Sequence, residues 1–435
     1  MESNADQCLK GRKVVAVACF DSFGKTAMTM LSACRKQGAE TELYLLQLTN
    51  RALSRRQRLG IRRTDRQTPI YKRPWKQFSE LASEIADNTD VLVLGLDGQR
   101  SRDALLQLSS VWGGKSKRPM IVSAYPGLLF RFALEGMLDR SGADLLCLNS
   151  ERDFDTYRQG RQAQGLDCDN AAVTGLPVLW NAQPSVKQTE HPSIVFFEQP
   201  SIPVHPLQRR FICRQLQGLA EAWPDHPVIF KPRTSSVEST LHRRHGEMAS
   251  VIEAMSEKIP NLKLSFKPAT RLLQSCGCAI TVSSTAALEA MAMGVSTRIV
   301  GDFGITETLG NHFFSKSGAV ADFASIRSNP FEVIHNTTWL REQGWMQHGE
   351  THFINAVLER LDHELVALPE NGTGSKSWGS SNWQTYAINH GGRRMLSSAG
   401  ALSSKRKRHK TRTAFRRIRD ALVGFGWLSQ WLKER

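Results

Sequence analysis

Hydrophobic residues in the first part of the chain come in short runs that are separated by longer amphipathic stretches. The runs are rich in Val, Ile and Leu and are bounded by turn-forming or charged residues, which is typical of buried β-strands. We expect strands at Val14–Phe20, Glu42–Gln47, Val91–Leu96, Pro119–Ser123 and Leu145–Asn149. The stretches between them predict helices at Lys25–Gln37, Trp75–Asp87, Ser101–Val111 and Phe132–Arg140. This alternation indicates an α/β fold, a parallel sheet with helices on both faces.

The same alternation restarts after a segment that contains prolines. In AAVTGLPVLWNAQPS a strand ends at Thr174-Gly175, and Pro177 and Pro184 follow, which we interpret as a hinge. Beyond it we expect strands in SIVFF, HPVIFKPR, CAITVSS and STRIVGD, and helices at Leu207–Trp223, at Glu247–Lys258 and in TAALEAMAM. The sequence therefore predicts two α/β domains in series, at residues 12–180 and 190–366.

The character of the chain changes after Leu368. The stretch PENGTGSKSWGSSNWQ is rich in Gly, Ser and Asn and has no apolar periodicity, so we expect residues 369–404 to form a flexible linker. Lys405 to Arg412 is nearly all cationic, and the segment after it regains an apolar stripe that includes Trp427 and Trp431. We expect residues 405–435 to form a basic amphipathic helix.

Composition narrows the class of protein. The 435 residues, 40% of them hydrophobic, are enough for two domains and a tail. No apolar run reaches the ~18–20 residues of a transmembrane helix, and the N-terminus lacks the pattern of a signal peptide, so we expect a cytoplasmic protein. The eight cysteines are scattered, and no second pair accompanies Cys276 and Cys278, so we expect no metal site.

The net charge of +16 is concentrated in two segments. Arg51 to Lys76 contains ten Lys and Arg residues and one Asp, a net charge of +9. Gly391 to Arg435 contains thirteen Lys and Arg residues and two acids, a net charge of +11. Because the rest of the chain is not basic, these two segments are where we expect anionic partners to bind.

The first strand leads into a segment that is similar to a nucleotide-binding loop. Gly24-Lys25-Thr26 follow the strand as in a P-loop, but the position where that motif requires its first glycine is Cys19. A P-loop kinase or NTPase that uses these three residues is therefore an alternative, and it leaves the second domain unexplained. The simpler interpretation is a strand, a tight loop and a helix that starts at Lys25.

The most informative segment is CAITVSSTAALEAMAMG. A buried strand leads into Ser283, Ser284 and Thr285, which open a helix. Their hydroxyls and the free amides of a helix N-terminus suit a phosphate, although Ser284 can also serve only as a cap. Glu289 is the one charge among Ala, Leu and Met, and its carboxylate can accept hydrogen bonds from ribose hydroxyls.

Two other strands of the second domain are followed by polar residues. Lys231-Pro232-Arg233 end one strand, and Gln199 and Ser201 follow the first strand of the domain. Because α/β sheets bind ligands at the carboxyl ends of their strands, we expect these residues on the edge that carries Ser283. Arg233 can bind a phosphate through two hydrogen bonds, and the alternative is a solvated loop.

In the first domain, Asp97-Gly98 follow an apolar strand. A carboxylate at the carboxyl end of a strand can act as a general base toward a hydroxyl. A magnesium ligand and a simple turn former are the alternatives that the sequence leaves open.

In this order, the segments resemble a known architecture, the glycosyltransferase fold with two Rossmann-like domains in tandem that is called GT-B. The resemblance covers about residues 12–365 and is carried by VTGLP, FFEQPS, FKPR and TVSSTAALEAMAMGV. Within this fold the chain is most similar to bacterial sialyltransferase-type enzymes and related glycosyltransferases of surface polysaccharide synthesis. Their D-G motif, which supplies the base, matches Asp97-Gly98, and their serine pair, which holds the donor phosphate, matches Ser283-Ser284. Where they have a His-Pro motif, this chain reads Lys231-Pro232-Arg233.

The resemblance implies a metal-independent glycosyltransferase that moves a sugar from a nucleotide-activated donor to a glycan or lipid-linked acceptor. The second domain would bind the nucleotide-sugar through Gln199, Ser201, Lys231, Ser283, Ser284, Thr285 and Glu289. Asp97 would be the catalytic base, and the Arg233 cation would stabilise the leaving phosphate. Asp21, Ser22 and Gly24 of the first domain would face the acceptor. No cofactor is implied, because the nucleotide-sugar is a substrate.

The basic tail predicts where the protein acts. A cationic run joined to an apolar stripe suits the interface of an anionic membrane, so we expect peripheral attachment to the inner face of the membrane. Two alternatives stay open for the tail. It can form a helix that packs back across both domains, or it can bind nucleic acid through KRKRHKTR, although no nucleic-acid-binding fold accompanies that run.

Overall fold

A computed structural model of the protein describes residues 8–48, 52–115, 117–128, 133–163, 167–180, 182, 189–199, 201–233, 248–334, 336–345, 348–363, 365 and 368. Contacts divide these residues into two units. Unit 1 holds the described residues up to Ala182 and those from Arg341 onward, and unit 2 holds those between. The prediction of two Rossmann-like α/β domains is confirmed. The predicted linker and tail helix, residues 369–435, lie outside the described residues.

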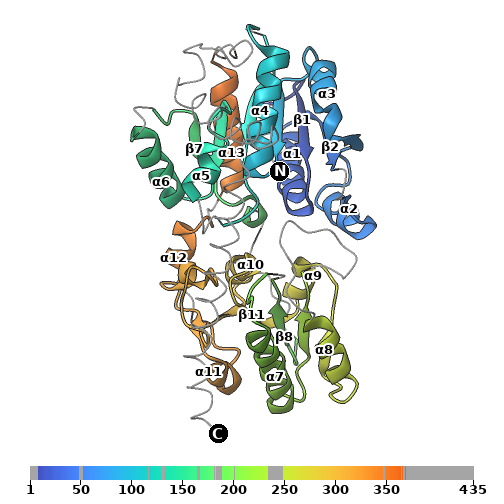
Figure 1. Ribbon diagram of the computed structural model, residues 1–435, viewed down its shortest axis with the longest axis vertical. Helices are drawn as coiled ribbons and strands as arrows, with labels where there is room; N and C mark the ends of the chain where they lie inside the picture. The colour runs from blue at the N-terminus through green and yellow to red at the C-terminus, as the bar shows by residue number, and fades with distance from the viewer. Residues whose placement is uncertain are drawn as a thin grey trace, which may run out of the picture. The chain divides into compact units, whose positions relative to one another are not determined.

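Unit 1 is built on a parallel sheet of seven strands in the order β3-β2-β1-β4-β5-β6-β7 (Figure 1). The strands are β1 Lys13–Ala18, β2 Glu40–Gln47, β3 Ile70–Pro74, β4 Val91–Gly95, β5 Met120–Ser123, β6 Leu145–Leu148 and β7 Ala171–Val173. The central strands are buried along their whole length, as expected for a parallel sheet that helices cover on both faces.

The helices of unit 1 are divided between the two faces of its sheet. They are α1 Asp21–Lys36, α2 Arg55–Arg62, α3 Phe78–Ile85, α4 Gly98–Trp112, α5 Ala133–Leu138, α6 Glu151–Gln162 and α13 Gly349–Leu361. Because side chains alternate along a strand, Val14 and Ala16 pack against α1 and α13, whereas Val15 and Val17 pack against α3 and α4. The buried apolar residues on the two faces are the main stabilising feature of the unit.

The first helix begins earlier than the sequence pattern predicts. We expected it to start at Lys25, but α1 starts at Asp21, and the N–H of Gly24 already donates to the carbonyl of Phe20 at 2.7 Å. A Cβ atom on Gly24 would lie 2.6 Å from the Cδ1 atom of Ile61, so glycine lets α2 approach closely. Gly24-Lys25-Thr26 are therefore helical residues, and the geometry of a P-loop is absent from this part of the described chain.

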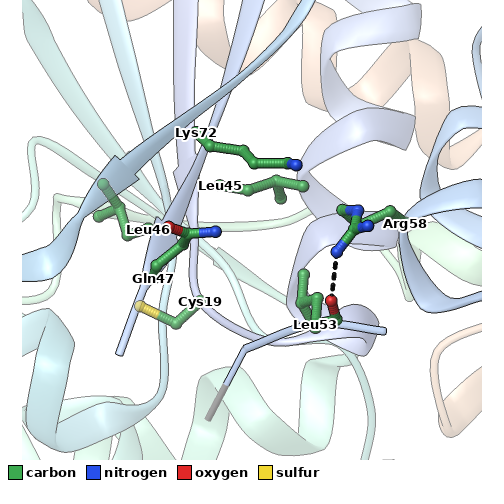
Figure 2. A pocket seen from close by; sticks show the side chains of 7 residues that line it. All are labelled: Cys19, Leu45, Leu46, Gln47, Leu53, Arg58 and Lys72. Atoms are coloured by element: carbon green, nitrogen blue, oxygen red, sulfur yellow. Dashed lines mark hydrogen bonds between the residues drawn. The ribbon is translucent and has the colours of Figure 1, made fainter. Parts of the chain in front are cut away.

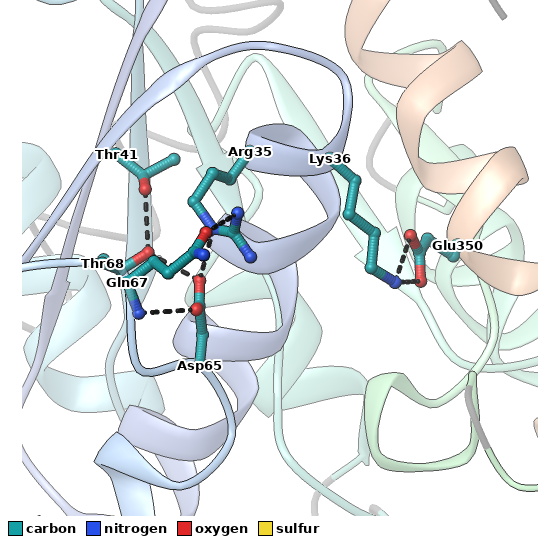
Figure 3. A network of polar contacts seen from close by, with 7 residues as sticks. All are labelled: Arg35, Lys36, Thr41, Asp65, Gln67, Thr68 and Glu350. Carbon is teal, nitrogen blue, oxygen red and sulfur yellow. Dashed lines mark hydrogen bonds and ion pairs between the residues drawn. The ribbon is translucent and has the colours of Figure 1, made fainter. Parts of the chain in front are cut away.

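A buried carboxylate fixes the turn between α2 and β3 (Figure 3). Asp65 accepts hydrogen bonds from the Arg35 Nε atom at 2.9 Å, from the Gln67 backbone at 2.9 Å and from the Thr68 hydroxyl at 2.8 Å. Thr68 also contacts the Thr41 hydroxyl of β2 at 2.8 Å. Burial alone would raise the pKa of Asp65, but these hydrogen bonds outweigh it and hold the pKa below its usual range. The network ties α1, β2 and the turn together.

The chain returns to unit 1 after it has formed unit 2. Helix α13 packs there: the Phe353 ring stacks on Trp180 with ring centroids 5.2 Å apart, and Lys36 pairs with Glu350 at 2.8 Å (Figure 3). The sequence placed the end of the second domain at residue 366, whereas the structure assigns the residues from Arg341 onward to unit 1. Sequence periodicity shows that a helix has an apolar face, but not which sheet that face meets.

Unit 2 contains a six-stranded parallel sheet in the order β10-β9-β8-β11-β12-β13. Its strands are β8 Ser193–Phe197, β9 Val228–Lys231, β10 Leu262–Leu264, β11 Cys276–Thr281, β12 Ser296–Val300 and β13 Val320–Ala321. Helices α7 Pro206–Ala222, α8 Met248–Ser256 and α11 Phe323–Ser328 cover one face, and α9 Ala269–Leu273 and α10 Ala286–Ala292 cover the other (Figure 1). Helix α12, Thr337–Glu342, contains the point at which the chain passes from unit 2 back to unit 1.

Candidate functional site

The strand order of unit 2 reverses between β8 and β11. The chain moves from β8 outward to β9 and β10, and β11 then lies on the other side of β8. At such a point the connections leave in opposite directions, and the carboxyl ends of the two strands are open to a ligand. The residues that follow these strands are Glu198 and Gln199 after β8, and Ser283 and Ser284 after β11.

Two of the predicted donor residues are hydrogen-bonded to each other at this point. The Gln199 Oε1 atom accepts from the Ser283 N–H at 2.8 Å and lies 3.1 Å from the Ser283 Oγ atom, which also lies 2.5 Å from the carbonyl of Leu309. Since the N–H requires an acceptor, the Gln199 amide is oriented with its NH₂ group away from Ser283. Within the described chain that NH₂ group has no partner, so it can donate to a ligand. Ser283 itself is fully buried and orients Gln199.

Ser284 and Thr285 lie at the start of α10. The Ser284 N–H donates to the Thr281 hydroxyl at 3.3 Å, and the Ser284 hydroxyl accepts from the Ala286 N–H at 3.3 Å, although the N-cap residue of α10 is Thr285. The hydroxyl proton of Ser284 is not used by these bonds. Thr285 makes no side-chain cap bond, and Glu289 lies half-buried in the first turn of the helix. The hydroxyl groups of Ser284 and Thr285 can therefore still donate to a ligand.

A buried ion pair that the sequence analysis missed lies beside these residues. The Glu198 carboxylate, 10% exposed, accepts from the Arg209 Nη2 atom of α7 at 2.6 Å, and the Arg209 side chain is 4% exposed. Burial raises the pKa of Glu198, and the positive charges of Arg209 and Lys231 act against that rise. Burial also lowers the pKa of Arg209. The FFEQP motif contains Glu198, but only the fold shows that its partner is Arg209.

The end of the neighbouring strand β9 also acts on this carboxylate, through the charge of Lys231 and the backbone of Arg233. Lys231 is buried, its Nζ atom donates to the Pro232 carbonyl at 3.1 Å, and its charge lowers the pKa of Glu198. The backbone N–H of Arg233 also bonds to Glu198, while the Arg233 side chain is exposed. The charges that act on this carboxylate are thus those of two cations, Arg209 and Lys231, so this edge of the sheet attracts anions.

Ser201 is the predicted donor residue that the structure leaves apart from this cluster. It is half-buried in the turn between Gln199 and Ile202, which form an isolated bridge, and within the described chain it makes no hydrogen bond to the other donor residues. Its predicted role in donor binding therefore stays a prediction.

Asp97 occupies the corresponding reversal point of unit 1, between β1 and β4. It is the N-cap of α4: its Oδ1 atom accepts from the Arg100 N–H at 3.3 Å, and its Oδ2 atom pairs with the Arg100 guanidinium at 2.5 Å. That guanidinium lies over the Phe20 ring, 5.4 Å from its centroid. The carboxylate is 15% exposed, so it is held in one orientation and still reaches the surface.

The three residues predicted on the acceptor side form the first turn of α1. Asp21 and Ser22 are half-buried, and the Asp21 Oδ2 atom lies 3.7 Å from the Lys25 ammonium. Gly24 is buried against Ile61, so it shapes the packing of α1 on α2 and does not line an open surface. Of the three, Asp21 and Ser22 alone have accessible side chains.

Within the described ranges, no group of three or more His, Cys, Asp and Glu residues could hold a metal ion. The same ranges contain no helix that is both long enough and apolar enough to cross a membrane.

Comparisons with known proteins agree with this architecture. The model of a protein family described as "Putative glycosyltransferase (DUF6716)" matches residues 14–361. No curated protein matches the sequence. Among solved structures, Arabidopsis thaliana UGT89C1 complexed with UDP-L-rhamnose is similar with a TM-score of 0.54 and 12% identity, over 81% of this chain and 100% of that one. Methanocaldococcus jannaschii UDP-GlcNAc 2-epimerase in complex with UDP-GlcNAc and UDP is similar with a TM-score of 0.53 and 12% identity, over 80% of this chain and 99% of that one.

A third similar structure is UDP-GlcNAc 2-epimerase from Neisseria meningitidis bound to UDP-GlcNAc, with a TM-score of 0.51 and 11% identity, over 80% of this chain and 100% of that one. At these identities the likeness concerns the fold alone. It confirms the resemblance to the GT-B architecture, and the closer resemblance to sialyltransferase-type enzymes stays a prediction.

Proposed function

Since the chain belongs to this glycosyltransferase family, we propose that it transfers a sugar from a nucleotide-activated donor to a hydroxyl of a glycan or lipid-linked acceptor in surface polysaccharide synthesis. The structures that share its fold and are complexed with UDP-GlcNAc or UDP-L-rhamnose support a nucleotide-sugar as the donor. The family description supports transfer as the reaction.

The observation that carries the proposal is the polar cluster at the strand reversal of unit 2. The Gln199 amide, held by Ser283, offers two N–H donors, and Ser284 and Thr285 offer hydroxyl protons. Lys231 adds positive charge beside Glu198, and the Arg233 cation follows it along the chain. Hydrogen-bond donors next to an excess of positive charge are what a diphosphate requires. We assign the ribose to Glu289 and the phosphates to the other residues.

The proposed reaction is a displacement at the anomeric carbon of the donor. Asp97 removes the proton from the acceptor hydroxyl, whose oxygen attacks the anomeric carbon, and the bond from that carbon to the phosphate oxygen breaks with its electron pair. The charge that develops on the phosphate is stabilised by Lys231, Arg233 and Ser284, a role that a metal ion has in other enzymes. Arg100 positions Asp97 through its ion pair.

The donor is identified by a thermal-shift screen against CMP-, UDP- and GDP-sugars. Only a ligand that binds the folded state raises the melting temperature. We expect one nucleotide class to do so, and the products of incubation with that sugar then show the reaction. Release of free nucleotide supports transfer, whereas a changed sugar still attached to its nucleotide would point to epimerisation.

The site assignment is tested with the double variant Ser284→Ala/Glu289→Ala. It should remain folded and bind the nucleotide more weakly, while Ser256→Ala/Glu253→Ala on α8 serves as the matched control. Equal affinities of the first variant and the wild type would exclude this edge of unit 2 as the donor site.

We also propose that residues 405–435 attach the protein to the inner face of the membrane, because their cationic run is joined to an apolar stripe. Deletion of residues 404–435 should abolish sedimentation with anionic vesicles at low salt. Undiminished vesicle binding by the folded truncated protein would exclude the tail as the anchor.

A further inference from the structure

Unit 1 contains a small pocket at the carboxyl ends of β1 and β2, beside the described part of the basic segment, residues 52 to 76 (Figure 2). Leu45 and Leu53 provide its apolar walls, and the Gln47 amide lies at its rim. Arg58 enters from α2 and Lys72 from the edge strand β3. The pocket therefore combines two cations, one amide and apolar surface, and none of its lining residues is acidic.

The fold places both cations at the pocket. Lys72 is the in-register partner of Leu45, so the two side chains project from the same face of the sheet. Arg58 is on a helix whose start is fixed by a capping box between Ser54 and Gln57, and its Nη1 atom donates to the Leu53 carbonyl at 2.5 Å. In Figure 2 the side chains of Arg58 and Lys72 extend toward one another from opposite sides, and the end of Leu45 lies next to them.

These two cations lack the acidic partners that neighbouring cations have. Arg35 pairs with Asp65 at 2.9 Å and Arg73 pairs with Glu84 at 3.2 Å. Within the part of the chain that the structure describes, neither Arg58 nor Lys72 makes an ion pair. Two like charges around one pocket repel each other, and a bound anion would remove that repulsion.

The pocket lies at the same edge of the sheet as the residue that we propose as the base. Cys19, which lines the pocket, follows β1, and Asp97 follows the neighbouring parallel strand β4, in which Gly95 is in register with Ala18 of β1. A molecule whose anionic group binds Arg58 and Lys72 therefore lies on the side of unit 1 that carries Asp97. The acceptor is the substrate that must be close to the base.

We infer that this pocket binds a phosphate group of the acceptor, carried on a carbon skeleton that contacts Leu45 and Leu53. A guanidinium and an ammonium together match the charge of a phosphate, and the leucines match its apolar attachment. The inference rests on the proposed function, because only a transfer reaction makes the bound molecule an acceptor substrate. The phosphate can belong to a lipid headgroup or to a soluble phosphorylated acceptor.

The test measures binding to the full-length protein without turnover. Hexyl phosphate is titrated by calorimetry against the wild type, against Arg58→Gln/Lys72→Gln and against the control Arg62→Gln/Lys76→Gln. The control removes the same charge from exposed positions of the same segment that do not line the pocket. We expect the pocket variant to bind about tenfold more weakly or worse, because charge-assisted hydrogen bonds are lost, and the control to bind like the wild type.

Vesicles distinguish the two sources of the phosphate. Sedimentation with phosphatidic acid vesicles that falls in the pocket variant alone assigns the site to a lipid phosphate. If hexyl phosphate binding depends on the pocket but all three proteins sediment equally with the vesicles, the site is assigned to a soluble phosphorylated acceptor. Absence of hexyl phosphate binding to the wild type, or an equal loss in pocket variant and control, overturns the inference.

The nucleotide-sugar thermal shift of the same variants separates this inference from the proposed function. The pocket variant should keep the full shift, because its substitutions lie in unit 1. If no nucleotide-sugar stabilises the wild type, the proposed function fails, while the phosphate titration still reports on the pocket. If only the titration fails, the proposed function stands without a phosphate pocket.

Discussion

The two sheets reverse their strand order in the same way but carry different chemistry at that point. In each unit the first strand lies beside the fourth, β1 beside β4 and β8 beside β11. After β4 comes Asp97, a carboxylate held by one arginine. After β8 and β11 come Gln199 and Ser283, an amide and a hydroxyl held by each other, with Lys231 alongside.

This difference shows that the topology provides the place and the side chains decide its use. The edge of unit 1 offers a group that can accept a proton. The edge of unit 2 offers N–H and O–H donors in a field of positive charge, which suits an anion. A chain with two similar domains can therefore divide the work between them, one for the base and one for the leaving group.

The largest expected effect is the loss of stability that Arg209→Met causes beside the polar cluster of unit 2. Loss of the guanidinium leaves Glu198 buried without its 2.6 Å partner, and breaking a buried ion pair costs about 3–5 kcal/mol of the free energy of unfolding. Urea unfolding measures this loss of stability. The control is Arg210→Met, a substitution at the exposed neighbouring position. The double variant Glu198→Gln/Arg209→Met should regain part of the loss. Equal stability of Arg209→Met and the control would mean that the pair does not support the site.

A second test is Asp97→Asn. Asparagine caps a helix as well as aspartate does, so the fold should persist while proton acceptance is lost. Turnover should fall by about 10²-fold or more, and Asp103→Asn on the same helix should be near wild type. Near-normal turnover of Asp97→Asn would move the role to another carboxylate of unit 1, Asp21 of α1 or Glu135 of α5.

Most of the fold could be predicted from the sequence where strands are buried. The run SIVFF predicts β8 from Ser193 to Phe197, as observed, because all five residues are buried. Strand β3, IYKRP, was missed because it is an edge strand with exposed charged residues. The start of α1 was placed too late, because DSFG has the composition of a loop although Phe23 and Gly24 are buried in the helix.

The candidate site was predictable only as a set of strand ends. Ser283 and Gln199 were expected on one edge because parallel strands share their carboxyl ends, and the structure joins them. The partner of Glu198 could not be inferred, since Arg209 belongs to the helix that follows and only tertiary packing directs it back. The pocket around Arg58 and Lys72 was seen in the sequence only as a basic segment, because charge alone does not show which cations are paired.

The smallest expected effect is on the pH dependence of the free energy of unfolding, and it comes from Asp153, a buried carboxylate of unit 1. Burial raises the pKa of Asp153 above its ordinary 3.8, although the Tyr125 hydroxyl bonds to it at 2.9 Å. The folded protein therefore holds this proton more tightly than the unfolded chain, so ionisation of Asp153 lowers the free energy of unfolding as pH rises above 3.8. In Asp153→Asn this contribution disappears.

The free energy of unfolding of each protein is measured with urea at about pH 4 and at about pH 7. Stability should fall less from the lower to the higher pH in Asp153→Asn than in the wild type. Asp155→Asn, exposed on the same helix, should follow the wild type. The same pH dependence in all three proteins would contradict the raised pKa.

The most direct test of the account is the affinity of unit 2 for its nucleotide-sugar. The nucleotide-sugar that stabilises the wild type is titrated against Lys231→Met, which keeps the buried aliphatic stem and removes the charge, and against Lys263→Met on the edge strand β10. The account predicts that Lys231→Met binds about tenfold more weakly or worse and that Lys263→Met binds like the wild type. Equal affinity of Lys231→Met and the wild type, with both folded, would contradict the claim that this edge holds the donor phosphate.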